Sequence, residues 1–549
     1  MLVRVLCKRC RVKALWTDEP RHFLEAICPA REGECEAELT SSRPRQARSE
    51  PSPSCAPQNS SERPHYEPLS ALDSSFLFFE SPTSPMHIAL VMIFDALPLR
   101  RRGGGLDVAR IRRHFAARLH WIPRYRQRIE VTPFGRQPVW VDDPAFDANA
   151  HIHHVKLVSA RSDQTLKELV GRILSKPLDR AKPLWEAWII EGLRGNRFAI
   201  VNKVHHCLVD GVAGAGLVAA VLSAEPWEAV AEVPPWTARP LPRPFELARD
   251  EIAGRMRTVG RLARTMLSAP FEAVASAASA LGTARSLLPA LLTALDSGPP
   301  TVLNEAPGSE RRFEWASFPL EDVREIRARL GGTVNDVVLA TVAGAVGRIL
   351  RDRGDESIPP AIRAAVPVNV RRDSDEGMLG NRVSIWLMSL PVGEADPVRR
   401  FALVREATEA LKESRQADGL DRLLGLVDSA GAGFMKLGAK LLERFRPYDL
   451  LVTNVPGPQV PLYLLGSQLV EAYPEVPLFW NQSLGIALFS YAGRLYWGFN
   501  ADAKLTVLPQ LVQAIGESFA ELCAAADVSG RLFTRNSRAA RAVPPSRGE

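Results

Sequence analysis

Apolar runs and helically spaced apolar positions alternate along the first half of the chain. Apolar side chains at Val108, Ile111, Phe115 and Leu119 follow the period of an α-helix and predict one at residues 107–119. A second helix is expected near residues 166–174. Runs rich in β-branched and aromatic residues predict strands at 87–95, 138–141, 183–191 and 197–204.

The second half repeats this mixture from about residue 301. Gly331 and Gly332 predict a turn, after which Thr333 or Asn335 caps a buried helix that runs to Leu350. The pair Ala492-Gly493 between two apolar runs predicts a hairpin of residues 484–491 and 495–500. Further strands are expected at 364–370, 381–387 and 449–454, with helices at 397–412, 430–442 and 508–525.

Shifts in composition suggest the domain boundaries. Residues 1–66 form an extension, rich in Ser, Pro, Arg and Gln from 40 to 64, that we expect to be mostly disordered or a misassigned start. Residues 67–224 and 301–528 are the two predicted domains, joined by a Pro-rich linker and crossover helices at 225–300. The Arg-rich residues 529–549 are predicted to be a basic disordered tail.

The crossover region contains a basic amphipathic segment with two interpretations. Ile252, Met256, Val259, Ala263 and Met266 share one helical face, and arginines occupy the rest of the surface. Such a helix can dock on an anionic membrane surface. It can equally be an ordinary crossover helix packed on the domains, with its arginines in solvent.

Length and composition limit the class of protein. The 549 residues suffice for two domains, and 46% hydrophobic with 24% charged residues is usual for a globular protein. The sequence has no apolar run of membrane-spanning length and no signal-peptide pattern, so a cytoplasmic location is expected. The net charge of +7 favours anionic partners such as lipid head groups or the phosphates of coenzyme A. Nucleic acid is the weakest of these candidates, because the sequence has no nucleic-acid-binding motif.

Two groups of potential metal ligands are weak candidates. Cys7, Cys10, Cys28 and Cys35 lack the spacing of a zinc ribbon. The segment 151–154 has three histidines but no accompanying carboxylate or cysteine, so we expect solvated or locally bonded side chains. No metal site is predicted.

The strongest chemical signal is the segment His205-His206-Cys207-Leu208-Val209-Asp210-Gly211, where the strand at 197–204 ends. Because consecutive strand residues point to opposite faces, only one histidine of the pair is expected to enter a given cavity. A histidine titrates near neutral pH and can remove and return a proton. Asp210 can fix the turn, and Gly211 permits a tight backbone conformation. The alternative is a pair of hydrogen-bonded core histidines, and Cys207 is interpreted as a small buried residue.

This segment resembles the His-His-x-x-x-Asp-Gly signature of the CoA-dependent acyltransferase (chloramphenicol acetyltransferase-like) superfamily. Within that superfamily the chain, from about Pro68 to Asp527, resembles the bacterial wax ester synthase/acyl-CoA:diacylglycerol acyltransferases. The resemblance rests on the order of several short blocks, which are Leu72–Phe76, Pro82–His87, Pro183–Trp185, Asn335-Asp336, Gly380–Arg382 and Asn454–Pro458.

The resemblance implies an α/β fold of two sandwich domains with a substrate channel between them. It implies that His206 is the general base, that His205 faces the core and that Asp210 is structural. Asn335 is a candidate donor to the oxyanion, with helix capping as the alternative. Gly211, Asn454, Pro183, Leu184 and Trp185 are expected to shape the substrate site or its packing.

The implied reaction moves a long-chain acyl group from acyl-CoA to diacylglycerol, a long-chain alcohol, or both. It uses acyl-CoA as a substrate and requires no metal or bound cofactor. The implied location is peripheral, at the inner membrane or on lipid inclusions. Two alternatives remain, a relative that acylates a small or polar acceptor and a non-catalytic lipid-binding scaffold of the same fold. Sequence does not choose between the two apolar acceptors, because hydrophobic pockets discriminate modestly among them.

Overall fold

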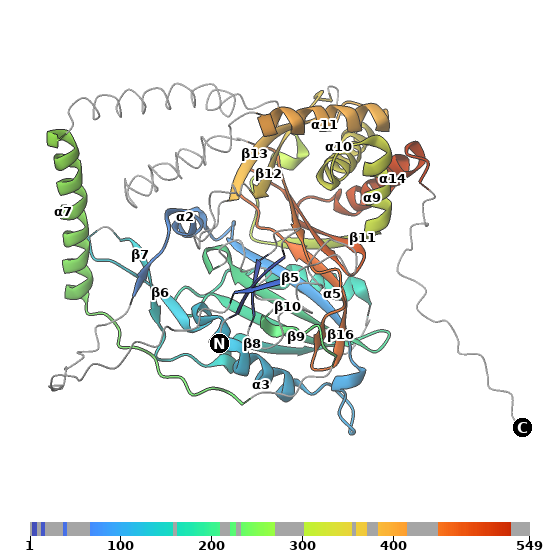
Figure 1. The fold of residues 1–549 in the computed structure, drawn as a ribbon. Coiled ribbons are helices and arrows are strands. Elements are labelled where there is room, and N and C mark those ends of the chain that lie inside the picture. The colour runs from blue at the N-terminus through green and yellow to red at the C-terminus, as the bar shows by residue number, and fades with distance from the viewer. Residues whose placement is uncertain are drawn as a thin grey trace, which may run out of the picture.

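The computed structural model describes residues 66–134, 136–157, 162–208, 220–226, 232–268, 301–353, 358–369, 383–413 and 448–528. It also describes three short strands near the N-terminus. Two six-stranded sheets dominate the molecule, one built mainly from the first half of the chain and one from the second (Figure 1).

The first sheet is mostly antiparallel and includes a strand from the second half of the chain. Its order is β15 (Tyr463–Leu464), β16 (Ser467–Glu475), β5 (His87–Asp95), β10 (Arg197–His205), β9 (Trp185–Leu193) and β8 (Ile152–Lys156). The strand β16 pairs with β5, with Glu475 opposite Ala89. The prediction of a separate C-terminal domain at 301–528 therefore needs a qualification, since residues 463–475 complete the N-terminal sheet.

The second sheet is mixed and carries helices on one side. Its order is β11 (Arg311–Pro319), β18 (Arg494–Asp502), β17 (Leu484–Tyr491), β14 (Leu450–Pro456), β12 (Ile362–Asn369) and β13 (Val383–Leu390). The helices α9 (Leu320–Leu330), α10 (Val334–Asp352), α11 (Pro397–Glu413) and α14 (Leu508–Ala525) gather beside it (Figure 1). The apolar faces of α10 and α14 share one buried core with this sheet.

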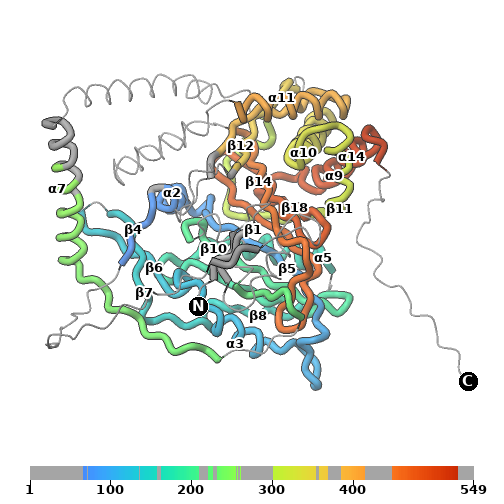
Figure 2. The backbone as a smooth tube through the Cα atoms, viewed as in Figure 1, coloured from blue at the N-terminus to red at the C-terminus, as the bar shows by residue number. Residues whose placement is uncertain are grey.

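Smaller elements surround the first sheet. They are α2 (Ala71–Phe79), α3 (Val108–Arg118), α4 (Ala148–His151) and α5 (Asp163–Leu174), and the sheet of β4 (Glu67–Pro68), β7 (Pro138–Asp142) and β6 (Gln127–Val131). The long helix α7 (Pro244–Ser268) stands at the margin of the molecule beside β7 (Figure 2).

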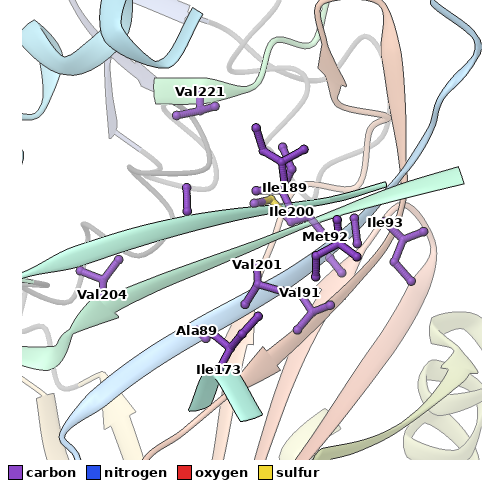
Figure 3. Close-up of a cluster of buried hydrophobic side chains, with 14 of the residues drawn as sticks. Ala89, Val91, Met92, Ile93, Ile173, Ile189, Ile200, Val201, Val204 and Val221 are labelled. Carbon is purple, nitrogen blue, oxygen red and sulfur yellow. The ribbon is translucent and has the colours of Figure 1, made fainter. Parts of the chain in front are cut away.

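The core of the first sheet explains why β10 reads as a continuous apolar run. Ile200 and Val201 are consecutive, point to opposite faces and are both fully buried. They pack among side chains of β5 and β9, such as Val91, Ile93 and Ile189 (Figure 3). Burial on both faces holds β10 rigidly, so the backbone of the histidines at its end has a fixed position.

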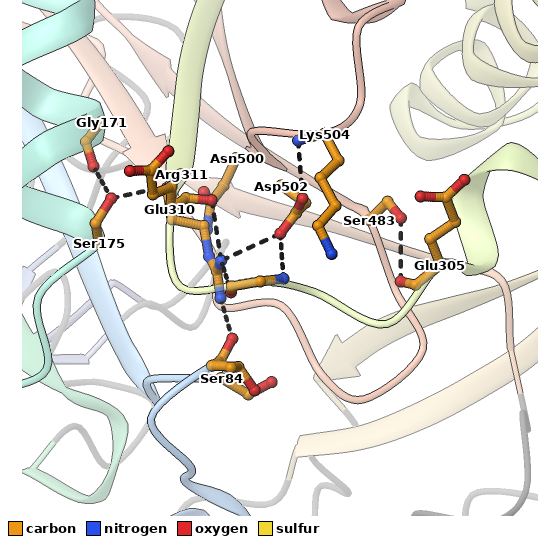
Figure 4. Close-up of polar contacts among 12 residues, drawn as sticks. Ser84, Gly171, Ser175, Glu305, Glu310, Arg311, Ser483, Asn500, Asp502 and Lys504 are labelled. Atoms are coloured by element: carbon orange, nitrogen blue, oxygen red, sulfur yellow. Dashed lines mark hydrogen bonds and ion pairs between the residues drawn. The ribbon is translucent and has the colours of Figure 1, made fainter.

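A buried arginine joins the two halves of the molecule. The backbone N–H of Arg311 donates to Ser175 Oγ at 2.9 Å, and its guanidinium donates to the carbonyl of Thr83. The same guanidinium lies 3.6 Å from Asp502 of β18 (Figure 4). Arg311 thereby ties the C-terminal sheet to α5 and to the loop that precedes β5.

Most predicted elements are present with small shifts at their ends. The predicted helix 508–525 matches α14, and the hairpin turn at Ala492-Gly493 joins β17 to β18 with positive φ at both residues. The predicted strand at 183–191 begins later, at Trp185, so Pro183 and Leu184 precede it. The predicted helix at 430–442, residues 273–295 and the tail after residue 529 lie outside the described residues.

The N-terminal extension contains elements that the sequence did not suggest. The strands β1 (Val3–Cys7), β2 (Lys13–Trp16) and β3 (Ala37–Thr40) form a small antiparallel sheet in the order β2-β1-β3. The extension as a whole was expected to be mostly disordered or a misassigned start, and that expectation stays a prediction beside these three strands. Cys10, Cys28 and Cys35 lie outside the described residues.

Among the helices that the structure describes, none alone is long and apolar enough to cross a bilayer. The helices α9 and α10 reach that length and composition only together, with a bend of 96° between them.

Candidate active site

The histidine pair sits where β10 ends and a 3₁₀ turn at His206–Leu208 begins. The backbone N–H of His205 donates to the carbonyl of Leu184 at 3.0 Å, and that of His206 donates to the carbonyl of Met86 at 2.8 Å. The predicted Pro-Leu-Trp block and the block that ends at His87 thus fix the backbone of the motif. The sequence blocks that carry the resemblance meet here in space.

His205 is fully buried, as predicted. Its Nδ1 accepts the backbone N–H of Cys207 at 3.1 Å, so the proton of the neutral ring belongs on Nε2. Nε2 lies 3.5 Å from Oε1 of Glu80. The backbone and a carboxylate therefore set the tautomer and the orientation of His205, which is a positioning role.

Glu80, which follows α2, connects this histidine to an arginine. Its carboxylate accepts Nε of Arg180 at 2.7 Å and the backbone N–H of Met86 at 3.2 Å. Burial would raise the pKa of Glu80, but the interactions with His205 and Arg180 outweigh it and lower that pKa to about 2. Glu80 is therefore a charged acceptor at neutral pH.

His206 points away from this network. Its ring stacks on Phe76 of α2, with 3.8 Å between centroids and 13° between the planes. Burial lowers the pKa of His206 to about 4. The imidazole is consequently neutral at pH 7, the form that accepts a proton.

The other members of the motif are partly described. Cys207 is buried, as expected, and burial raises the pKa of its thiol well above the usual value, so it carries no thiolate. Asp210 and Gly211 lie outside the described residues, so their predicted roles remain predictions.

Asn335 is close to another predicted site residue. Thr333 is the cap of α10 and forms a capping box with Asp336, in which each side chain bonds the backbone of the other. The capping alternative for Asn335 is therefore wrong. The Oδ1 of Asn335 instead accepts Nδ2 of Asn454 at 2.8 Å, which holds the Asn335 amide in place and leaves its own NH₂ group as a donor.

Pro183, Leu184 and Trp185 contribute to packing. All three are buried, and Trp185 stacks on Tyr125 with 4.6 Å between ring centroids. The indole N–H of Trp185 donates to the carbonyl of Tyr125 at 2.8 Å. These residues were expected either to shape the substrate site or to contribute to its packing, and the contacts of Trp185 support packing.

The histidines at 151–154 are locally bonded, as expected. His151 Nδ1 lies 2.9 Å from the carbonyl of Trp185, and His154 Nε2 lies 3.2 Å from Glu191. The ring of His153 packs on Trp188. Within the described ranges no three His, Cys, Asp or Glu side chains gather as a metal-binding group.

Sequence reasoning missed Phe76, Glu80 and Arg180. Phe76 belongs to the first quoted block, but nothing in a helical pattern indicates that its ring covers a histidine 130 positions later. Glu80 is a charged residue directly after an apolar helix, a weak signal that gains meaning only from the buried His205. Arg180 lies in a polar loop with no signal of its own.

Comparison with solved structures identifies the class of fold to which this chain belongs. A condensation domain of the calcium-dependent antibiotic synthetase, 18% identical, matches 85% of this chain and 97% of its own with a TM-score of 0.50, which concerns the fold alone. The fold is thus the two-domain, chloramphenicol acetyltransferase-like fold.

The family model "Wax ester synthase/diacylglycerol acyltransferase catalytic domain" matches residues 69–338, and the model "WS/DGAT C-terminal domain" matches residues 379–523. The chain belongs to this wax ester synthase/diacylglycerol acyltransferase family, as the sequence resemblance implied.

Individual relatives cover nearly their whole length. A probable diacylglycerol O-acyltransferase of Mycobacterium tuberculosis is 30% identical over 469 residues, which are 83% of this chain and 96% of the relative. A second, putative enzyme of that name and organism is 32% identical over 86% of this chain and 99% of its own. The solved wax ester synthase/diacylglycerol acyltransferase of Marinobacter aquaeolei is 26% identical, with a TM-score of 0.58 over 84% of this chain and 100% of its own.

Proposed function

We propose that this acyltransferase moves a long-chain acyl group from acyl-CoA to diacylglycerol, a long-chain alcohol, or both, with His206 as the general base. The observation that carries the proposal is the position of His206 at the end of a strand buried on both faces, with an imidazole kept neutral because burial lowers its pKa to about 4. Family membership indicates the reaction class, and the names of the relatives indicate the acceptors.

Nδ1 of His206 is buried and has no hydrogen-bond partner among the described residues. We assign the basic lone pair to Nε2, the other ring nitrogen. Nε2 takes the proton of the acceptor hydroxyl as its oxygen attacks the thioester carbonyl. When the carbon–sulfur bond breaks, the same proton passes to the CoA thiolate.

A tetrahedral oxyanion forms between these two steps. The NH₂ group of Asn335, oriented by Asn454, is the donor that we propose for it. A neutral donor aimed at a developing oxyanion contributes about 2.7–4 kcal/mol to catalysis. The reaction needs no metal or bound cofactor, because the thioester supplies its driving force.

We also propose that the enzyme works at a membrane or lipid-inclusion surface on the cytoplasmic side. On α7, Phe245, Ile252 and Met256 are exposed by 73%, 50% and 69%, and their spacing of seven and four residues places them on one stripe. The opposite side is anchored, since Leu247 packs on Val139 in the small sheet.

The apolar stripe of α7 therefore supports surface docking over the alternative of an ordinary packed crossover helix. The exposed Arg257 on the same helix suits an anionic surface. An apolar acceptor resident in that surface would then need no passage through water.

Acyl transfer from labelled palmitoyl-CoA by the purified protein tests the proposal. Diacylglycerol, hexadecanol and a small polar alcohol are offered separately. Product from either long-chain acceptor supports it, and the preferred acceptor defines the substrate. Product from the polar alcohol alone, or no product from folded protein, would favour the small-acceptor enzyme or the lipid-binding scaffold respectively.

A further inference from the structure

A basic cleft lies on the outer side of the first sheet, away from the histidine pair. It has a volume of about 740 Å³ and is walled by the loop before α3, by one face of α3 and by the edge strand β8. Its charged lining consists of Arg101, Arg112, Arg113, His154, Lys156 and Glu191. Pockets of this size hold small organic ligands.

The face of α3 that lines the cleft combines small and basic side chains. Ala109, Arg112, Arg113 and Ala116 follow the i, i+3, i+4, i+7 spacing that places residues on one helical face. The opposite face of the helix packs on the core through Ile111 and Phe115. On the face toward the cleft, alanines at both ends leave a hollow, and two arginines occupy its middle.

Positive charge in the cleft exceeds its negative charge. Arg101 lies 3.3 Å from Asp107, while Lys156 and His154 share Glu191 at 3.7 and 3.2 Å. Within the described part of the chain, neither Arg112 nor Arg113 has a carboxylate within 4.0 Å. One Nη of Arg112 donates to the carbonyl of Ile152 at 2.9 Å, which holds that guanidinium against the wall.

We propose that this cleft binds a phosphate group carried by a ligand other than the acyl-CoA that reacts at His206. Two neighbouring guanidinium groups and a lysine provide the forked, charged donors that phosphate oxygens prefer. The ligand is either a soluble phosphate compound or the head group of a phospholipid, and both present the same chemistry to the cleft.

Strand register separates the cleft from the reacting end of the sheet. Lys156 pairs with Glu191, and Glu191 pairs with Phe198, which lies seven residues before His205 on β10. Seven residues of strand span about 23 Å. The cleft also lies on β8, two strands away from β10. It is therefore a second site rather than an extension of the first.

The test measures binding of inorganic pyrophosphate to the full chain by calorimetry at fixed ionic strength. The variant is Arg113→Glu, and the control is Arg102→Glu, which makes the same charge change at an exposed position outside the lining. We expect Arg113→Glu to weaken binding at least tenfold and Arg102→Glu to change it less than twofold. Equal losses in both variants, or no binding by the wild type, would overturn the proposal.

Two further probes identify the source of the phosphate. The first is flotation with phosphatidylcholine vesicles, with and without phosphatidate. If binding that depends on phosphatidate is lost in Arg113→Glu and kept in Arg102→Glu, the ligand is a lipid. Pyrophosphate binding without that vesicle effect shows a soluble ligand. Free coenzyme A is the second probe, and loss of its binding in Arg113→Glu alone would assign the cleft to the acyl donor and overturn a separate site.

Discussion

The ring of Phe76 lies flat against the imidazole of His206, 3.8 Å from centroid to centroid. The contact comes from a helix near the start of the described chain and covers one face of the proposed base. It keeps water from that face, and burial is the main cause of the low pKa of His206. Phe76 is therefore a positioning residue whose effect is visible in the pH dependence of the reaction.

Replacing Phe76 by Leu should change that pH dependence. The wild-type base is neutral above a pKa of about 4, so kcat/KM should fall only as the pH drops toward that value. In Phe76→Leu, water reaches the ring and the acidic limb should move up toward the ordinary histidine value of about 6.5. A loss of about tenfold in kcat at neutral pH should accompany the shift, since the ring is no longer held.

Phe79→Leu is the matched control for this prediction. Phe79 lies on the same helix but contacts Trp480, with 5.0 Å between ring centroids. Its substitution should leave the acidic limb where it is. An unchanged pH profile in Phe76→Leu would contradict the role of the stacked ring.

The charge on Glu80 should stabilise the folded protein in a definite pH range. Its folded pKa of about 2 is below the ordinary value, so the stabilisation is present above about pH 4.5 and disappears as the pH falls toward 2. Glu80→Gln should lower the free energy of unfolding by roughly 2–3 kcal/mol at pH 7, and the difference should shrink at acidic pH. Chemical denaturation of both proteins from pH 3 to 7 measures this.

Glu130→Gln provides the comparison for a surface ion pair. Glu130 lies 2.7 Å from Arg128 and is more exposed, so its loss should cost less than about 1 kcal/mol. If Glu80→Gln were no more destabilising than Glu130→Gln, the contact of Glu80 with His205 and Arg180 would have no energetic role.

Substitutions at Asn335 and Thr333, which lie on the same helix turn, distinguish a loss of catalysis from a loss of the helix cap. Asn335→Ala should reduce kcat by about 10²–10³-fold with little loss of stability, as removal of an oxyanion donor does. Thr333→Ala removes the helix cap and should cost about 1 kcal/mol of stability while kcat is largely kept. Steady-state kinetics and denaturation of both variants measure these effects. If Asn335→Ala lost stability but kept its kcat, Asn335 would have no part in the mechanism.

Glu475 on β16 should make the protein less stable at alkaline pH. It is buried, and its Oε1 accepts Nδ2 of Asn500 at 2.6 Å. Burial raises its pKa to about 8, despite the opposing charges of Arg311 and Lys203. A raised pKa means that the stabilisation is complete below about pH 4.5 and is lost as the pH rises through 8.

Glu475→Gln should remove this dependence. The wild type should lose stability relative to the variant between pH 5 and pH 8, as chemical denaturation at each pH would show. A variant that becomes the less stable of the two at pH 8 would mean that the carboxylate is ionised and paired with Arg311 or Lys203.

The sequence predicted the elements that are encoded by the pattern of neighbouring residues. The continuous apolar run that ends at His205 is β10, buried on both faces, and the pair of histidines lies at its end as expected. His205 is buried because it ends a strand that is buried on both faces. The final helix and the hairpin at Ala492-Gly493 likewise depend on short-range signals that the folded chain keeps.

Contacts between distant segments could not be predicted in this way. The insertion of β16 into the N-terminal sheet joins residues nearly 400 positions apart, and no periodicity encodes that pairing. The same holds for Phe76 on His206 and for Asn454 on Asn335, which depend on how whole elements pack. The capping alternative for Asn335 failed because Thr333, two residues earlier, has a better geometry for the cap.

The most direct test of the central claim compares the wild type with His206→Ala in single-turnover acyl transfer from palmitoyl-CoA to the preferred long-chain acceptor. His206→Ala should bind palmitoyl-CoA normally and lose at least about 10²-fold in the rate of acyl transfer, because the proposed acceptor of the hydroxyl proton is removed. Equal rates in folded wild type and His206→Ala would contradict the assignment of His206 as the base.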